Sequence, residues 1–302
     1  MPLVAQNPDR ITSLCPLGVR LRDDATGRTV DDGPVVVACP KSDPARRLAA
    51  TANRSGLYVF HHLPGLRELE NAEGSAEFWS NLPENSRRPF VVEVQDPSGW
   101  FLPFTFEVRL PYQGVFNLDC ALTASPPFPL LSPPASALAQ VPLFSAPQRP
   151  VPRGLAALRA DLCDTVEQEP ARWAVVAVTC SVPFRAPVRG LGIADERGSL
   201  LVLFSYPEPN DLFPGSPLNN GLPLAEQEWK VSLMAHYRRQ SAPPRVPDLC
   251  TVLGQQSQPA AQLWSDAGLT QELREATLKF GRELIVTTTG AKQSKLILTP
   301  AA

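Results

Sequence analysis

The sequence predicts a mainly β protein made of two tandem antiparallel β-sandwiches joined by a proline-rich strap. Short runs rich in Val, Ile, Phe, Tyr and Thr are separated by turn residues, a pattern typical of sandwiches. Prolines, 34 in all, crowd the middle of the chain, where they disfavour helix and central strand. A similar order of strands and turns precedes and follows this stretch. We therefore expect a first sandwich at 12–123, a strap at 124–153 and a second sandwich at 154–302.

The composition fits a protein with a packed core. Hydrophobic residues make up 43% of the chain and charged residues 19%. The formal net charge of −2 gives no general attraction to nucleic acid or to an anionic membrane. The N-terminus lacks a signal-peptide pattern, and no apolar run is long enough to span a bilayer. We expect a cytoplasmic protein, or one released within an assembled particle without a signal peptide.

Four stretches of the first copy are rich in β-branched or aromatic residues and end at turn signals. We expect strands within 18–40, 48–65, 88–101 and 104–123. Each strand would bury its alternating face against a second sheet. The side chains expected to point inward are Val35, Val37, Tyr58, Phe60, Val92 and Val94. Their burial, at ~1.5–3 kcal/mol each, would make the first copy a stable unit by itself.

The second copy repeats this order of strands. We expect strands within 154–183, 188–209, 228–239 and 282–300. In both copies a Val-rich strand that ends in cysteine is followed by a turn containing glycine and then by an apolar strand. The parallel indicates a tandem duplication.

The second copy also contains a segment that departs from the strand pattern. In residues 261–281, the spacing of Leu269, Leu273 and Leu278 predicts one amphipathic helix, with Thr270 as its N-cap. This helix would be inserted before the last strands of the second sandwich.

The strap carries Leu, Val and Phe among its prolines, unlike a flexible Gly/Ser tether. It is predicted to be an extended segment lying against a domain or a partner.

The six cysteines are predicted to be buried reduced thiols. They include no CxxC pair, and only three histidines are present, so a zinc site has no local scaffold. Cys39 and Cys180 end matching strands, which favours a small apolar site over reactivity. The six are Cys15, Cys39, Cys120, Cys163, Cys180 and Cys250.

No catalytic centre can be assembled from the sequence. His61 and His62 are adjacent on a strand, so their rings point to opposite faces. "GLGIAD" at 190–195 lacks the third glycine of a dinucleotide fingerprint. Four aspartates of one hairpin could hold calcium, but their spacing favours Asx turns. They are Asp23, Asp24, Asp31 and Asp32. We expect no enzyme activity, no cofactor and no metal site.

The stretches VRLRDDATGRTVDDGPVVV and ATANRSGLYVFHHLPG carry a family resemblance. They resemble the prealbumin-like sandwich of carboxypeptidase regulatory-like domains, well over 19–65 and loosely over 90–123. The second copy departs from the pattern at Asp164, Thr165 and Tyr206. The resemblance implies a prealbumin/Ig-like sandwich in tandem and an accessory scaffold or binding role.

The tandem sandwiches and the strap segment LFSAPQRPVPRGLAALRADLCD also resemble accessory structural proteins of phage-tail-like contractile injection systems. This resemblance implies a non-enzymatic structural or interaction subunit of a large particle, such as a baseplate, collar or cap accessory. The expected partners are other subunits of the particle, with no nucleic acid and no direct membrane insertion. Self-association is left open.

Large apolar side chains in loops and in the strap are the candidate interface, because solvated loops rarely need them. They are Trp100, Phe101, Phe104, Phe128, Phe144, Leu212 and Phe213. The structural alternative is that they fold back over the open ends of the sandwiches. The alternative function is a carbohydrate-binding or adhesive module, in which Trp79, Trp100 and Trp229 form a platform for sugars.

Overall fold

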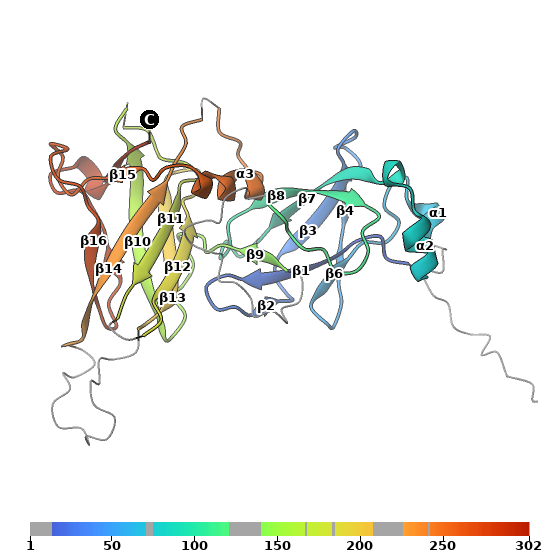
Figure 1. Ribbon diagram of the computed structural model, residues 1–302, viewed down its shortest axis with the longest axis horizontal. Helices are drawn as coiled ribbons and strands as arrows, with labels where there is room; N and C mark the ends of the chain where they lie inside the picture. Colours follow the sequence, from blue (N-terminus) through green and yellow to red (C-terminus); the bar gives the residue numbers. More distant parts are fainter. Residues whose placement is uncertain are drawn as a thin grey trace, which may run out of the picture.

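The computed structural model describes residues 14–70, 75–120, 140–166, 168–182, 185–207, 226–240 and 242–301. Figure 1 shows two β-sandwiches side by side along the long axis, with α3 (Leu249–Leu253) between them. In the described part of the chain the strands form four sheets, two in each sandwich. The prediction of a mainly β, tandem-sandwich protein is confirmed.

The first sandwich packs one five-stranded sheet against one four-stranded sheet. The five-stranded sheet contains β1 (Gly18–Asp23), β2 (Thr29–Val30), β5 (Thr51–Ala52), β6 (Leu57–Val59) and β9 (Val141–Leu143). The four-stranded sheet contains β3 (Val35–Pro40), β4 (Leu48–Ala49), β7 (Arg88–Gln95) and β8 (Phe104–Leu110). Two short helices, α1 (Arg67–Glu70) and α2 (Ala76–Asn81), lie in the connection before β7.

The second sandwich has the same numbers of strands in its two sheets. The larger sheet contains β10 (Leu155–Asp164), β13 (Ser199–Ser205), β15 (Gln262–Leu263), β17 (Leu284–Ile285) and β18 (Leu296–Thr299). The smaller sheet contains β11 (Val175–Cys180), β12 (Val188–Ile193), β14 (Glu228–His236) and β16 (Glu275–Lys279). The sandwiches are mainly antiparallel, but each carries a parallel pairing.

The two sandwiches share one pairing scheme. β1 pairs antiparallel with β6 and parallel with β9, and β10 pairs antiparallel with β13 and parallel with β18. Asp23 lies beside Leu143 of β9, as Asp164 lies beside Leu298 of β18. The next backbone N–H in each copy donates to that leucine carbonyl, at 3.1 Å and 2.9 Å. Asp23 and Asp164 therefore occupy equivalent positions, which supports the predicted repeat.

The buried face of β3 differs from the prediction by one residue. Val36 and Ala38 are buried, whereas Val35 is 45% exposed. Val36 lies opposite Val94 and Ala38 opposite Val92 on β7, and residues directly opposite in an antiparallel pair share a face. The inward valines of β7 therefore select the even-numbered positions of β3. The predicted burial of Tyr58, Phe60, Val92 and Val94 is confirmed.

The predicted helix near 261–281 is wrong. Leu263 lies in β15 and Leu278 in β16, and both are buried in the second core. Between these strands the carboxylate of Asp266 accepts the backbone N–H of Thr270 at 3.2 Å, so Thr270 belongs to a turn. Of the three leucines on which the helix was predicted, Leu278 is buried in a strand, Leu273 is half-buried and Leu269 is 39% exposed in this turn, so they do not share one helix face.

Within the described residues, the α-helix of the second half is α3 instead. Asp248 is its N-cap, because its carboxylate accepts the backbone N–H of Thr251 at 2.8 Å. Leu249, Val252 and Leu253 are buried against the first sandwich, although the helix follows β14 in the chain. Among the described residues, none of the helices has the length and apolar character needed to cross a membrane.

The glycines of "GLGIAD" allow β12 to approach β13 closely. A Cβ on Gly192 would lie 2.8 Å from Val202 Cγ2 and 2.9 Å from the Leu201 carbonyl oxygen. A Cβ on Gly190 would lie 2.9 Å from Phe204 Cβ. Because these glycines have no side chain, β12 of one sheet can pack closely against β13 of the other sheet of the second sandwich.

The substitution Gly192→Ala is expected to lower the free energy of unfolding by ~1–3 kcal/mol, the cost typical of overpacking. A backbone carbonyl cannot rotate away from the new methyl group, so relaxation is costly. The matched control is Gly254→Ala, because a Cβ there meets nothing within 4 Å. Urea unfolding measures both variants, and equal midpoints would contradict the close-approach explanation.

The described part of the strap belongs to the first sandwich. β9 pairs with β1, and Val141, Leu143 and Phe144 are buried in the first core. A boundary at residue 123 therefore leaves out a strand of that sandwich, and it also leaves out α3. Residues 121–139 of the strap lie outside the described residues.

Two of the six cysteines form a disulfide. Cys120 and Cys250 are bonded across a sequence separation of 130 residues, with their Cα atoms 5.0 Å apart. The prediction of six reduced thiols is wrong for this pair. The contact depends on α3 returning to the first sandwich, which no local spacing indicates.

The remaining cysteines, Cys15, Cys39, Cys163 and Cys180, are free. Cys39 and Cys180 lie on corresponding strands but on opposite faces. Cys180 is buried in the second core with Val176 and Val178, whereas Cys39 lies on the outward, half-buried face of β3. The two cysteines are therefore not equivalent positions, and the prediction that they match is wrong by one residue.

Candidate functional site

The seam between the sandwiches brings together segments that are far apart in the sequence. The segment before α3 lies alongside β8. The backbone N–H of Thr105, in β8, donates to the Pro247 carbonyl oxygen at 2.8 Å. After α3, Gln255 accepts the Arg238 N–H and donates to the Trp173 carbonyl, both at 2.8 Å. This segment is therefore bonded to both sandwiches.

Trp173 is the largest of the side chains that the second sandwich contributes to the shared core, together with Val175 and Ile193. It precedes β11, but its buried side chain belongs to the hydrophobic cluster of the first sandwich. Its Nε1 donates to the Pro244 carbonyl at 3.0 Å, and its φ of 60° is left-handed. A non-glycine residue in that region needs support from its surroundings, and the two hydrogen bonds at Trp173 supply it.

Arg149 anchors the strap by a buried ion pair. Its guanidinium donates to Asp23 Oδ1 at 3.0 Å and to Asp23 Oδ2 at 2.7 Å, and the two side chains are 7% and 6% exposed. The guanidinium also lies 4.7 Å from the ring centre of Phe101. Burial raises the pKa of Asp23, but the hydrogen bonds from Arg149 and Thr26 outweigh it, and the net pKa is lowered.

The strap is also bonded to the second sandwich. Arg159 of β10 donates to the carbonyl oxygens of Pro147 and Arg149. Residues 147–149 are thereby held between β1 on one side and β10 on the other.

Two of the four aspartates considered for calcium have structural roles. Asp23 pairs with Arg149 and also accepts the Ala25 N–H at 3.1 Å in an Asx turn. Asp24 pairs with Arg22 at 3.2 Å, and burial raises the pKa of Asp24 to about 6. Asp31 and Asp32 are exposed. Across the described ranges, no three His, Cys, Asp or Glu side chains are grouped so that they could hold a metal ion.

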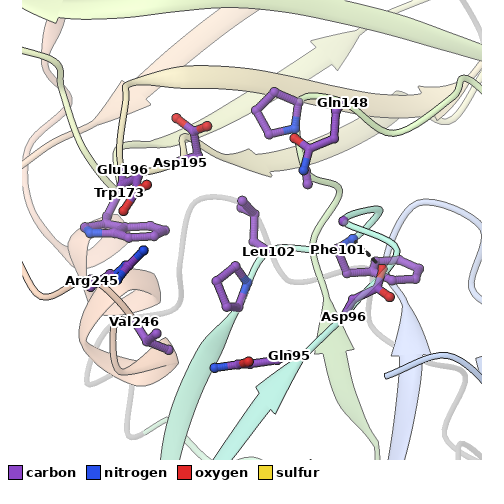
Figure 2. A pocket seen from close by; sticks show the side chains of 14 residues that line it. Gln95, Asp96, Phe101, Leu102, Gln148, Trp173, Asp195, Glu196, Arg245 and Val246 are labelled. Carbon is purple, nitrogen blue, oxygen red and sulfur yellow. Dashed lines mark hydrogen bonds between the residues drawn. The ribbon is translucent and has the colours of Figure 1, made fainter. Parts of the chain in front are cut away.

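A cleft of about 550 Å³ lies at the seam. Its lining comes from the turn after β7, the strap, the turn before β13 and the segment before α3. Figure 2 shows Trp173, Asp195 and Glu196 across the cleft from Asp96 and Phe101. The remaining lining residues are Gln95, Gly99, Leu102, Pro103, Ala146, Pro147, Gln148, Arg245 and Val246.

Hydrogen bonds fix both walls of this cleft. The Asp96 carboxylate accepts the backbone N–H groups of Ser98, Trp100 and Phe101 at 3.0, 2.8 and 3.1 Å. On the opposite wall, Asp195 Oδ1 accepts the N–H groups of Arg197 and Ser199 at 2.8 and 2.9 Å. Burial raises the pKa of Asp195.

The predicted interface residues fall into three groups. Phe101, Phe104 and Phe144 are buried in the first core, so they are not available to a partner, and their assignment is corrected. These rings pack inward from β8, from the turn before it and from the strap. Trp100 is 50% exposed, as an interface residue requires. Phe128, Leu212 and Phe213 lie outside the described residues.

The three tryptophans of the alternative function do not form one platform. Trp229 is buried in the second core, with its ring centre 6.4 Å from that of Phe280 and 5.9 Å from that of Tyr206. Trp79 lies in α2 and is partly buried. Trp100 remains as the exposed member of the set.

Three of the free thiols, Cys39, Cys163 and Cys180, are poor nucleophiles at neutral pH. Burial raises the pKa of Cys180 to about 11, and it also raises the pKa of Cys163 and of Cys39. Since the thiolate is the reactive form, these cysteines are structural groups.

His236 is the buried histidine of the seam. It lies opposite Val175 of β11, and its Nδ1 is 3.1 Å from the Gln258 carbonyl oxygen. Its Nε2 finds no hydrogen-bond partner within the described residues. Burial, the larger effect, lowers the pKa of His236 despite the Gln258 contact.

The free energy of unfolding is expected to fall as the pH drops below 6.5, the ordinary pKa of histidine. Below that pH His236 is protonated in the unfolded chain, whereas in the folded protein its lowered pKa keeps it neutral. The matched comparison is His236→Gln, which cannot take up this proton. Unfolding measured at pH 7.5 and pH 5.0 should show the wild type losing more stability than the variant. Equal losses would contradict this assignment.

Sequence reasoning missed Arg149, Trp173 and the disulfide. Arg149 is the one charged residue in the strap stretch "FSAPQRPV", which is a signal for a buried partner. Trp173 precedes a Val-rich strand directly, so a role in packing could be expected. The pairing of Cys120 with Cys250 had no comparable signal.

These features define a protein of two tandem β-sandwiches with one continuous seam. No family model matches the chain, and no curated protein is similar to it. One similar solved structure is a 9R-lipoxygenase from Cyanothece PCC8801, at 11% identity and a TM-score of 0.19, covering 51% of this chain. The match spans only 17% of the lipoxygenase chain.

Another similar structure is a mutant of the shaft pilin SpaA from Lactobacillus rhamnosus GG. It has 7% identity and a TM-score of 0.22, and the match covers 96% of this chain and 99% of the pilin chain. Both TM-scores are too low to add to the description of the fold, which rests on the strands and pairings above.

Proposed function

We propose that this chain is a non-enzymatic structural and interaction subunit of a larger protein assembly. The supporting observation is the seam, which holds the two sandwiches at one relative orientation. It combines a shared hydrophobic core, the buried Arg149–Asp23 pair and the Cys120–Cys250 disulfide. Domains within a chain move relative to each other unless their interface is large and apolar, so this seam favours a rigid spacer.

The kind of assembly follows from the sequence resemblance. We propose a phage-tail-like contractile injection particle, in which the chain is a baseplate, collar or cap accessory. The similarity of the first copy to carboxypeptidase regulatory-like domains also favours an accessory module. Trp100, half exposed on a turn that Asp96 fixes, is the described candidate for contact with a neighbouring subunit.

The disulfide indicates the kind of cellular location in which the subunit functions. Disulfides persist in oxidising surroundings and are rare in the cytosol. Cys120–Cys250 therefore favours release of the assembled subunit over a lasting cytoplasmic location.

The test is purification of the tagged protein from its native host, with mass spectrometry and negative-stain microscopy of one eluate. The proposal expects particles with stoichiometric partner proteins, and tail-like particles would support the contractile kind. The control is Trp100→Ala, which should reduce recovery of partners without changing the unfolding midpoint. A lone monomer with no stoichiometric partner would overturn the proposal.

A glycan-binding module is the alternative, and Trp100 is the observation that favours it. A glycan array compares the wild type with Trp100→Ala. Glycan binding that is lost in Trp100→Ala would support this alternative. Absence of binding to every glycan on the array would count against it.

A further inference from the structure

We propose that the cleft at the seam binds an extended peptide of a partner subunit in which basic side chains alternate with apolar ones. The inference rests on the proposed function, because it names the chemistry of a partner. Three properties of the cleft favour such a peptide: its rigidity, its charge and its available surface.

The cleft has fixed walls. One wall is held by Asp96, which fixes the turn leading to Phe101, and the other by Asp195, which fixes the turn before β13. Its volume of about 550 Å³ is within the range of pockets that take small ligands or short peptide segments. A preformed cleft binds with a small loss of conformational entropy.

The charge of the lining favours a cation. Asp96, Asp195 and Glu196 carry negative charges, and Arg245 carries a positive one, so the lining has a net charge of 1 − 3 = −2. Within the described residues, neither Asp195 Oδ2 nor the Glu196 carboxylate accepts a hydrogen bond from the protein. Both therefore remain free to accept one from a Lys or Arg side chain.

The apolar lining favours peptide over sugar. Pro103 and Pro147, both half-buried, form apolar surface that Leu, Val or Pro side chains can cover. A sugar stacks on an open ring face, but Trp173 is buried and the Phe101 ring is occupied by the Arg149 guanidinium at 4.7 Å. Anionic ligands, including nucleotides, are disfavoured by the same carboxylates.

The test uses an array of octapeptides in which Lys or Arg alternates with Leu, Val and Pro. A second array has Gln at each basic position. We expect binding to members of the first array and not to their Gln counterparts. Fluorescence anisotropy with the strongest labelled octapeptide then gives the affinity of the wild type and of each variant.

The cleft variant is Asp195→Asn combined with Glu196→Gln. Asparagine keeps the Oδ1 acceptor of the turn, so the fold is retained while two charges are removed. We expect binding at least tenfold weaker. The matched control is Glu68→Gln with Glu77→Gln, which removes two charges from exposed positions in α1 and α2.

Three results would overturn the inference. They are equal binding to both arrays, unchanged affinity in the cleft variant, and equal weakening in the control variant, which would indicate non-specific charge attraction. Each of these results leaves the recovery of particles from the host unaffected, so failure of the cleft is distinguishable from failure of the proposed function.

Discussion

The substitution Arg149→Met is expected to lower the free energy of unfolding by ~3–5 kcal/mol, the cost of leaving one member of a buried ion pair alone. The Asp23 carboxylate is almost fully buried and takes both guanidinium bonds from Arg149. The substitution also removes the cation from the ring of Phe101. Chemical denaturation of the wild type and the variant measures the loss.

The chain offers a matched control for this prediction. Arg239 makes the equivalent forked contact with Asp164 at 2.8 and 2.7 Å, but its side chain is 50% exposed. The Asp164 carboxylate is itself buried, at 2% exposure, but the place that the half-exposed Arg239 guanidinium would vacate is open to water, so Arg239→Met should cost clearly less than Arg149→Met. In a double variant, Asp23→Leu with Arg149→Met should recover part of the loss, since no charge then remains buried alone. Equal losses at Arg149 and Arg239 would contradict the role of burial.

Replacing both Cys120 and Cys250 by serine is expected to lower the free energy of unfolding by ~4–5 kcal/mol in the chain-entropy model, because the bond closes a very long loop. The sequence separation of 130 residues covers the strap and most of the second sandwich. Thermal unfolding without reductant measures the difference. Reductant should shift the wild type toward the double variant and leave the double variant unchanged.

The control for the disulfide is Cys39→Ser. Cys39 is a free thiol on the half-buried outer face of β3, so its loss should change stability little. Alkylation of the unfolded, unreduced protein followed by intact mass should show four reactive thiols, namely the four free cysteines. Six alkylated cysteines would contradict the disulfide.

The strands were predictable because their signals are local. Alternation and turn residues identify β7 and β8 directly, and Gly56 and Gly198, with φ of 69° and 79°, mark corresponding turns in the two copies. The face of β3 was not predictable from "VVV", since a continuous apolar run carries no alternation. Its partner β7 decides the face.

The errors in the second half have a common cause. The helix was predicted from Leu269, Leu273 and Leu278, of which only Leu278 is fully buried in the second core, and a leucine spacing does not distinguish a helix face from a turn followed by a strand. The candidate site required contacts between segments more than 100 residues apart, such as Arg149 with Asp23. A pattern of residues along the chain does not show which distant segments are in contact, so the cleft could not be predicted from the sequence.

The pairing of β9 with β1 and the burial of α3 have a consequence for biosynthesis. A ribosome releases β1 through β8 long before Val141, and Leu253 emerges only after most of the second sandwich. The first sandwich therefore cannot complete its core while the chain is still short, and Cys120 has no partner until Cys250 appears. The nascent N-terminal half exposes apolar surface until near the end of translation, which makes this interval the one in which a chaperone would be needed.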